Sequence, residues 1–285
     1  MGVRFGYADT SFGQLHYAEQ GRGPVILLLH QTPRSWDEFR ELIPLLANNF
    51  RVIAMDMVGF GASASLPAPQ TVEDFAQGAW ELLDALGVDR ATVLGHHTGA
   101  AVALEMAAAA ADGGRLDAVV LSSCPWADAQ YRAGHTGAGG VDCAEHVPDG
   151  AHLRRLWDLR RPYYPAPATD LLDRFLHDAL SFGVDPAEGH RACGRYRMEE
   201  RIGSVTVPVL LIGAGADPFS MPALPKLREH LVGAPSVTEV VIEDGTVALV
   251  ERHADRVATA VCEFLANVNT TAAPVTADTL VARHL

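Results

Sequence analysis

Hydrophobic and polar positions along the chain alternate between strand-like and helix-like patterns. Two weakly alternating segments at residues 3–9 and 13–19 flank a turn and predict a hairpin. A continuous apolar run at 25–29 is typical of a buried central strand, and further strands are expected at 51–55, 91–94, 117–122, 209–213 and 237–242. Helical spacing occurs at 35–46, 71–86, 98–111, 222–232 and 251–266. This order predicts an α/β fold with a mostly parallel, eight-stranded sheet covered by helices on both faces.

The pattern changes between residues 124 and 203, where no strand is evident. Helical stretches near 149–161, 169–182 and 187–201 accompany a glycine-rich loop at 134–140. We therefore expect a core of residues 1–123 and 204–268, interrupted by a helical cap at 124–203. Residues 269–285 have no clear periodicity and predict a tail that is either loose or docked on another subunit, as in a homodimer.

Composition narrows the range of partners. Hydrophobic residues make up 48% of the chain, enough for a large core, and the net charge is −13. Such a charge disfavours nucleic acid and anionic membranes as partners. The first ten residues lack the apolar stretch of a signal peptide, so a cytoplasmic location is expected. The four cysteines are widely spaced and the histidines show no ligand spacing, so neither a metal nor another cofactor is expected.

The most informative motif is Gly-His-His-Thr-Gly at residues 95–99, between a predicted strand and a predicted helix. In the pattern G-x-S-x-G, this strand-to-helix turn lifts its central side chain above the end of the sheet. Here His97 occupies the serine position. A neutral imidazole can accept a proton but makes a poor stable acyl carrier. The motif therefore points to chemistry other than ordinary hydrolysis.

Three further segments, in the expected order, make the chain resemble the α/β-hydrolase superfamily over roughly residues 12–266. The resemblance is to the epoxide-hydrolase and dehalogenase branch, which has a helical cap. Residues 29–33 (Leu-His-Gln-Thr-Pro) resemble its H-G-x-P turn, and residues 56–63 resemble its D-x-x-G-x-G-x-S loop. Residues 208–213, followed by Asp217, resemble the strand that carries the triad acid. The resemblance implies an oxyanion site formed by the backbone N–H groups of Thr32 and Thr98.

The departures from this family concern its catalytic residues. Counting back from Glu251 places Thr246 where the family has its triad histidine, so Asp217 alone remains of the triad. Gln31 replaces the glycine of the oxyanion turn, where a longer side chain would narrow or re-polarise the mouth of the site. We expect His97 to reach Asp217, directly or through one water, and to rebuild a His–Asp base. The helix N-terminus disfavours the imidazolium and Asp217 favours it.

Several residues beside these motifs have a functional and a structural interpretation. His30 borders the site but is expected to bond a neighbouring loop. Arg34 is either a solvated charge or an anchor for an anionic substrate, and Trp36 either packs in the core or contacts substrate. Trp126 and Trp157 belong to a cap whose aromatic residues would suit a large planar substrate. Fold-supporting roles are expected for Asp56, His96 and Glu251.

Together these features predict a cofactor-free enzyme acting on a large aromatic or polyketide-like molecule in natural-product metabolism. A base beside an oxyanion site, without a nucleophile, suits enolate or phenolate chemistry. The leading hypothesis is carbon–carbon bond formation by Michael or aldol-type addition or cyclisation, or a related lyase or isomerase reaction. Three alternatives remain open: cofactor-independent oxygenation of an aromatic substrate, hydrolysis by water that His97 activates, and ligand binding without catalysis.

Overall fold

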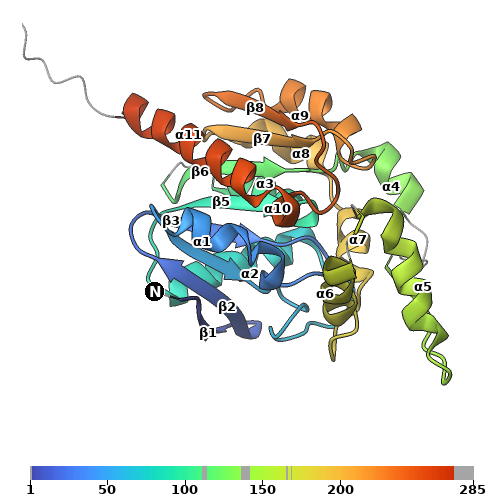
Figure 1. Cartoon of the computed structure of the whole chain (residues 1–285). Helices are drawn as coiled ribbons and strands as arrows, with labels where there is room; N and C mark the ends of the chain where they lie inside the picture. The colour runs from blue at the N-terminus through green and yellow to red at the C-terminus, as the bar shows by residue number, and fades with distance from the viewer. Residues whose placement is uncertain (1, 111–113, 136–141, 165, 168, 273–285) are drawn as a thin grey trace, which may run out of the picture.

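The computed structural model describes residues 2–110, 114–135, 142–164, 166–167 and 169–272, except for the side chains of His135 and residues 269–272 (Figure 1). One eight-stranded sheet has the order β1-β2-β4-β3-β5-β6-β7-β8. β1 and β2 form an antiparallel hairpin, β2 pairs antiparallel with β4, and the remaining pairs are parallel. The strand bounds are β1 Arg4–Thr10, β2 Gly13–Gly21, β3 Val25–Leu29, β4 Arg51–Met55, β5 Ala91–His96, β6 Leu116–Ser122, β7 Val209–Ala214 and β8 Val237–Ile242. This arrangement confirms the predicted eight-stranded α/β fold.

Helices cover both faces of the sheet (Figure 1). The bounds are α1 Leu42–Leu46, α10 Leu249–Arg252 and α11 Ala254–Ala272 on one face, and α2 Val72–Ala85, α3 Thr98–Ala109 and α9 Leu224–His230 on the other. The central strand β3 shows why both faces need covering. Leu27 and Leu29 belong to the apolar cluster on the face covered by α2 and α3. Ile26 and Leu28 belong to the apolar cluster on the face covered by α1 and α11. All four side chains are fully buried, so neither side of this strand meets water.

Local sequence signals account for the ends of α2. The Thr71 hydroxyl accepts from the N–H of Asp74, and the Asp74 carboxylate accepts from the N–H of Thr71, which forms a capping box. An N-terminal cap of this kind is worth about 1 kcal/mol. After α2, Gly87 takes a φ of +63°, a conformation that glycine adopts without strain.

A helical insertion follows β6 and precedes β7. Its elements are α4 Ala129–His135, α5 Ala151–Arg160, η2 Arg161–Tyr163, α6 Thr169–Ala179, α7 Glu188–Cys193, α8 Met198–Arg201 and η3 Ile202–Ser204. The described residues between β6 and β7 form no strand. Cys193, Tyr196 and Met198 belong to the same apolar cluster as the α2–α3 face of the sheet. The second half of the insertion is therefore packed directly onto the sheet domain.

Some helix predictions were wrong in detail. The predicted helix at 35–46 is two pieces, the 3-10 turn η1 Trp36–Phe39 and the short α1. Pro44 explains the break, because its ring would clash with the carbonyl of Arg40 in a continuous helix. The segment 187–201 also divides into α7 and α8, and 222–232 is α9 preceded by the turn η4 Met221–Ala223.

Two further differences concern the insertion and the C-terminal end. Helix α4 was not predicted. It begins after Asp128, whose carboxylate accepts from the N–H of Tyr131 at 2.9 Å. The closing helix divides into α10 and α11, and α11 continues to Ala272, beyond the predicted end of the core at 268. The remainder of the predicted tail, 273–285, and most of the glycine-rich loop, 136–140, lie outside the described residues. Across the described chain, no helix is both long and apolar enough to cross a membrane.

Candidate active site

The turn between β5 and α3 has the geometry that the motif at 95–99 predicts. His97 takes φ +47° and ψ −114°, a strained conformation for a residue with a Cβ. Its N–H donates to the carbonyl of Ser122 at 3.0 Å, which fixes the turn to β6. Close backbone packing requires both glycines. A Cβ on Gly99 would lie 2.0 Å from the Leu29 carbonyl oxygen, and one on Gly95 would lie 2.0 Å from the Gly99 carbonyl oxygen.

The structure brings His97 and Asp217 together. His97 Nε2 lies 2.9 Å from Asp217 Oδ2. The side chain of His97 is 14% exposed and that of Asp217 is fully buried. The ring is not aligned for a linear hydrogen bond, so the contact is mainly electrostatic. No bridging water is needed at this distance.

Asp217 is held as a charged group. It lies just after β7, and its carboxylate accepts from Ser220 Oγ at 2.6 Å and from the N–H of Phe219 at 2.9 Å. Burial alone would raise the pKa of Asp217. The neighbouring His97 and the two donors outweigh burial and hold the pKa of Asp217 well below its ordinary value. The carboxylate is therefore negative at neutral pH.

The orientation of the ring decides which nitrogen of His97 is basic. Nε2 faces the carboxylate, and Nδ1 makes no hydrogen bond with the described part of the chain. A carboxylate beside Nε2 favours the neutral tautomer with its proton on Nε2. In that tautomer the lone pair of Nδ1 is the one that can accept a proton.

The strand-to-helix turn at residues 95–99, which we call the elbow, is supported by His96, in agreement with the expected structural role of this residue. Its fully buried ring donates from Nε2 to the carbonyl of Val247 and accepts at Nδ1 from Ser122 Oγ, both at 3.0 Å. Its edge lies against the His97 ring, with centroids 4.7 Å apart. Burial, together with the neighbouring His97, lowers the pKa of His96 to about 3. His96 is therefore a fixed neutral group.

The loop that carries Thr246 lies beside both the elbow and the acid. The carbonyl of Gly245 accepts from the N–H of Ala216, and the carbonyl of Val247 accepts from His96. Thr246, between them, is half-buried, and its hydroxyl accepts from the N–H of Ala248 at 3.4 Å. Its hydroxyl thus caps its own turn.

Thr32 and Thr98 meet on the other side of the elbow. Their buried hydroxyl oxygens are 3.1 Å apart. Thr98 is the first residue of α3, so its N–H has no partner within the helix. No acceptor within the described residues takes the N–H of either threonine. Both N–H groups are therefore available to an oxygen anion.

Gln31 and His30 are turned away from the candidate site. The backbone N–H of Gln31 donates to Glu38 at 2.7 Å, and its side-chain amide donates to the other oxygen of Glu38. His30 donates from Nδ1 to the Gln31 carbonyl and accepts at Nε2 from the N–H of Met57. The expectation that Gln31 narrows the mouth of the site was wrong, because buried Glu38 draws its amide inward. His30 has the loop-bonding role that was expected.

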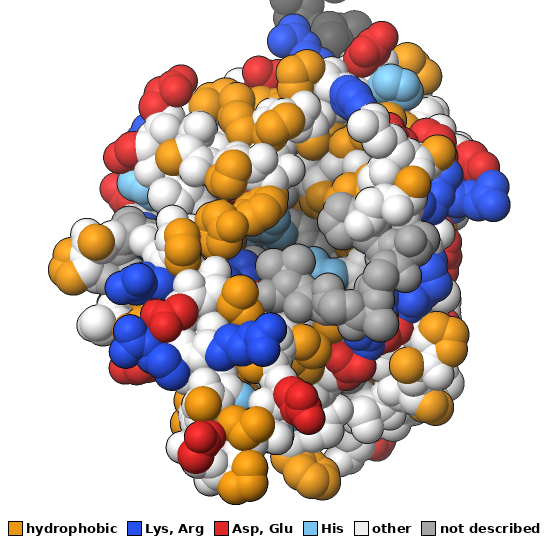
Figure 2. Space-filling model, turned by 90° about the vertical axis from the view of Figure 1, so that its right-hand side faces the viewer, with side chains coloured by type: hydrophobic (Ala, Val, Ile, Leu, Met, Phe, Trp, Pro, Cys, Tyr) orange, Lys and Arg blue, Asp and Glu red, His pale blue; other side chains and the backbone are white. Residues whose placement is uncertain are grey.

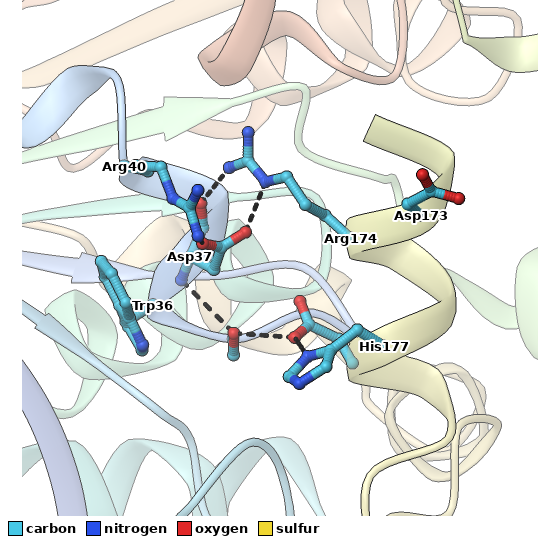
Figure 3. A pocket seen from close by; sticks show the side chains of 8 residues that line it. Trp36, Asp37, Arg40, Asp173, Arg174 and His177 are labelled. Atoms are coloured by element: carbon cyan, nitrogen blue, oxygen red, sulfur yellow. Dashed lines mark hydrogen bonds and ion pairs between the residues drawn. The ribbon is translucent and has the colours of Figure 1, made fainter. Parts of the chain in front are cut away.

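Arg34 is neither solvated nor free to anchor a substrate. Its fully buried guanidinium contacts Asp178 at 2.8 Å, Glu251 at 2.7 Å and Asp37 at 3.4 Å. Asp178 lies on α6, so Arg34 ties the insertion to the sheet domain. Figure 3 shows Arg174 of α6 reaching toward Asp37 in the same network. Both proposed roles for Arg34 are corrected: it is a structural cation, and Glu251 is one of its structural partners.

The three predicted tryptophans lie apart from His97 in different ways. Trp36 donates its backbone N–H to Asp56, and its side chain lines a separate pocket of about 390 Å³ beside α6 (Figure 3). Trp126 donates from its indole N–H to Asp128 and contacts the His230 ring at an angle of 50°. Trp157 packs at the edge of a small apolar cluster that joins the insertion to Ala248. Substrate contact by these residues is not supported by a direct contact with the His97 site.

The face of the molecule that carries the insertion is hollowed near its centre, and histidine side chains are visible at the base of the hollow (Figure 2). Hydrophobic side chains gather along part of its rim. Within the described ranges, no group of three or more His, Cys, Asp or Glu side chains could hold a metal ion.

Comparison with known proteins agrees with this geometry. Residues 24–141 match the family described as "alpha/beta hydrolase fold". An epoxide hydrolase from an endophytic Streptomyces has a TM-score of 0.77 at 23% identity, covering 94% of this chain and 97% of that one. The enol-lactonase from Burkholderia xenovorans LB400 has a TM-score of 0.72 at 21% identity, covering 92% and 100%. The chain is an α/β-hydrolase-fold protein.

Comparison of sequences shows which α/β-hydrolase-fold proteins this chain is similar to. The chain is 40% identical over 101 residues to the bifunctional epoxide hydrolase 2 of Mus musculus, which covers 33% of this chain and 18% of that protein. It is 34% identical over 116 residues to the haloalkane dehalogenase 2 of Mycobacterium tuberculosis strain H37Rv, which covers 40% of each. The chain thus spans between about a fifth and two fifths of the curated relatives it matches. The predicted resemblance to epoxide hydrolases and dehalogenases is confirmed.

Proposed function

We propose that this protein is a cofactor-independent enzyme that removes a proton from a carbon acid or a phenol, with His97 as the base. The contact of 2.9 Å between His97 Nε2 and buried Asp217 carries this proposal. The elbow position, where a nucleophile would stand, holds an imidazole. A base with a fixed carboxylate beside it is suited to proton transfer.

Each group has a defined task in this reaction. Asp217 keeps a proton on Nε2 of His97, so Nδ1 takes the proton from the substrate. The imidazolium that forms then faces the negative charge of Asp217, which stabilises it. The substrate oxygen becomes an enolate or phenolate and accepts from the N–H groups of Thr32 and Thr98, each donor being worth about 3 kcal/mol in the transition state.

The anion formed in this way leads to the chemistry that we favour. It can add to an electrophile, which forms a carbon–carbon bond, or it can eliminate or take a proton back at another carbon. We favour a Michael or aldol-type addition or cyclisation in natural-product metabolism, with a large aromatic substrate. The net charge of −13 also supports a small molecule rather than a nucleic acid as the substrate.

Hydrolysis by a water that His97 activates is the second candidate. The sequence similarity to epoxide hydrolases and haloalkane dehalogenases supports this candidate. The same base would then take its proton from water rather than from carbon. The two candidates differ in what they do to an ester, an epoxide and a 1,3-dicarbonyl compound.

The test is hydrogen–deuterium exchange at carbon. Wild type and His97→Gln are incubated in D₂O with a panel of 1,3-diketones and naphthols, and deuterium at the activated carbon is followed by NMR. Wild type should exchange at least roughly a hundredfold faster than His97→Gln, since general base catalysis contributes on that scale. His177→Gln, which changes an 83% exposed histidine of α6, is the matched control and should behave as wild type.

The other hypotheses predict different results with the same proteins. Ester or epoxide turnover that is lost in His97→Gln, without exchange at carbon, would favour hydrolysis instead. Oxygen consumption with an aromatic substrate would favour oxygenation. Tight binding that leaves every substrate unchanged and survives His97→Gln would favour a binding protein.

A further inference from the structure

Four polar side chains in the insertion, three of them buried, form a cluster that the proposed proton transfer does not use. They are Asp142, Arg160, Tyr164 and His190. Asp142 is fully buried, and one of its oxygens accepts from the guanidinium of Arg160 and lies 2.8 Å from His190 Nε2. Arg160 is 5% exposed and Tyr164 is 6% exposed. These three side chains are therefore enclosed by protein, while the His190 side chain is 27% exposed.

Part of its hydrogen-bonding capacity is unused. Arg160 Nε, the Tyr164 hydroxyl and Asp142 Oδ1 are buried and have no hydrogen-bond partner within the described chain. Buried polar atoms are nearly always paired, because an unpaired one has lost its hydrogen bonds to water. Three such atoms in one cluster indicate side chains placed to bind a polar group.

Arg160 and Tyr164 both lie beside the ring of Phe175. The Arg160 guanidinium carbon lies 4.7 Å from the centre of the Phe175 ring, and the Tyr164 ring centre lies 6.4 Å from it. Phe175 is 1% exposed and belongs to α6. Stacking on this ring and pairing with Asp142 fix the plane of the guanidinium, so the direction of its Nε–H is set in advance.

Two members of the cluster have neighbours at the edge of the candidate site. His190 follows Gly189, whose α-carbon is so close to Thr32 that a Cβ would lie 2.2 Å from Thr32 Cγ2. On the other side, Tyr164 packs in one apolar cluster with Ala248, which adjoins the loop that holds His96. The backbone next to His190 thus lies against the oxyanion turn, and Tyr164 lies in the same apolar cluster as Ala248, two residues after Thr246.

The available groups specify the ligand chemistry. Arg160 offers a charged N–H, and burial, followed by the carboxylate of Glu251, holds the pKa of Tyr164 above its ordinary value, so Tyr164 offers a neutral O–H. Both groups donate toward oxygen. Arg160 pairs with a single carboxylate, whereas Arg34 contacts three, so Arg160 keeps the capacity to bind a second anionic oxygen.

We propose that Arg160 and Tyr164, held in place by Asp142, His190 and Phe175, form a subsite that binds a carboxylate or phenolate oxygen of the substrate. The subsite adds a substrate class to the proposed function. Binding at the subsite does not depend on the proposed function, whereas the reaction that follows at His97 does. The substrate is then an acidic aromatic molecule with its anionic end in the insertion and its reactive carbon at the elbow.

The test compares benzoate with benzamide, its neutral counterpart of the same shape, by isothermal titration calorimetry at pH 7.5. Wild type should bind benzoate at least roughly tenfold more tightly than benzamide. Tyr164→Phe should weaken benzoate binding roughly tenfold, and Arg160→Gln should weaken it by at least as much. The matched controls are Tyr163→Phe, the neighbouring tyrosine, and Arg154→Gln on the exposed face of α5, and both should bind as wild type.

Tyr164→Phe separates binding from folding. It removes a hydroxyl that has no partner within the described chain, so the thermal unfolding temperature should not fall. The subsite is refuted if benzoate does not bind at millimolar concentration, if benzamide binds equally well, or if both variants keep wild-type affinity. Benzoate binding in a protein that shows no exchange at carbon would leave the subsite standing and refute the proposed function.

Discussion

The clearest physical consequence of the elbow is an acid-sensitive stability that depends on His96. Its ring is fully buried and neutral, with a pKa of about 3, because burial and the adjacent His97 oppose protonation. In the unfolded chain the same side chain has the ordinary value of 6.5. Between pH 6.5 and pH 3 the unfolded state therefore binds a proton that the folded state does not. Stability from His96 is complete above about pH 6.5 and is lost as the pH falls through this range.

The size of the effect follows from the two pKa values. Each pH unit within the window is worth about 1.4 kcal/mol, so the folded state loses about 3 kcal/mol between pH 6.5 and pH 4.5. Other buried groups act in the opposite direction. Burial raises the pKa of Glu38 to about 8, partly opposed by Arg34, so its contribution to stability grows as the pH falls. The pH dependence of the wild type alone would mix these contributions.

The assay is therefore a comparison with His96→Gln, in which the amide stays uncharged and can still donate toward the Val247 carbonyl. Urea unfolding at pH 8, 6.5, 5.5 and 4.5 gives the free energy of unfolding of both proteins. Wild type should be the more stable at pH 8, and its advantage should shrink by about 3 kcal/mol by pH 4.5, since contributions common to both proteins cancel. His177→Gln, at an exposed position, should keep a constant difference from wild type. A constant difference for His96→Gln as well would refute the reasoning.

Two further predictions concern the acid and the elbow. Asp217→Asn removes the charge that stabilises the His97 imidazolium, so deuterium exchange at pH 7.5 should fall roughly a hundredfold or more, and a rate close to wild type would exclude Asp217 from catalysis. Gly99→Ala places a Cβ 2.0 Å from the Leu29 carbonyl oxygen and should cost about 3 kcal/mol or more in urea unfolding. Gly134→Ala in α4, where a Cβ meets nothing within 4 Å, should be neutral or stabilising, and equal effects at both glycines would contradict the packing argument.

Strands were easier to predict than helices because their signal is local. The predicted strands 25–29 and 237–242 have the same bounds as β3 and β8. The segment 35–46 was misread because its apolar spacing continues through Pro44 while the helical backbone does not. Helix α4 lacks an apolar stripe, and the cap at Asp128 was its only local signal.

The same division applies to the candidate site. His97 and Asp217 each lie at the carboxyl end of a parallel strand, so their approach could be expected from motif positions alone. The contacts of Gln31 and Arg34 could not be expected from motif positions, because tertiary packing sets their partners. Arg34 meets Glu251, which is 217 positions away, and a carboxylate from the insertion. The Arg160 cluster was missed for the same reason: its members come from three segments between residues 142 and 190.

The pairing of His97 with Asp217 also bears on whether the site is active or inherited. A fully buried carboxylate is costly unless hydrogen bonds and positive charge compensate it. Ser220 and Phe219 supply neutral donors, and His97 is the partner that can become a cation at the moment it takes a proton. The compensation is therefore greatest in the protonated state, which is the state a general base reaches during turnover. A pocket used only for binding gains nothing from that arrangement, which supports a base role for His97 over a purely structural one.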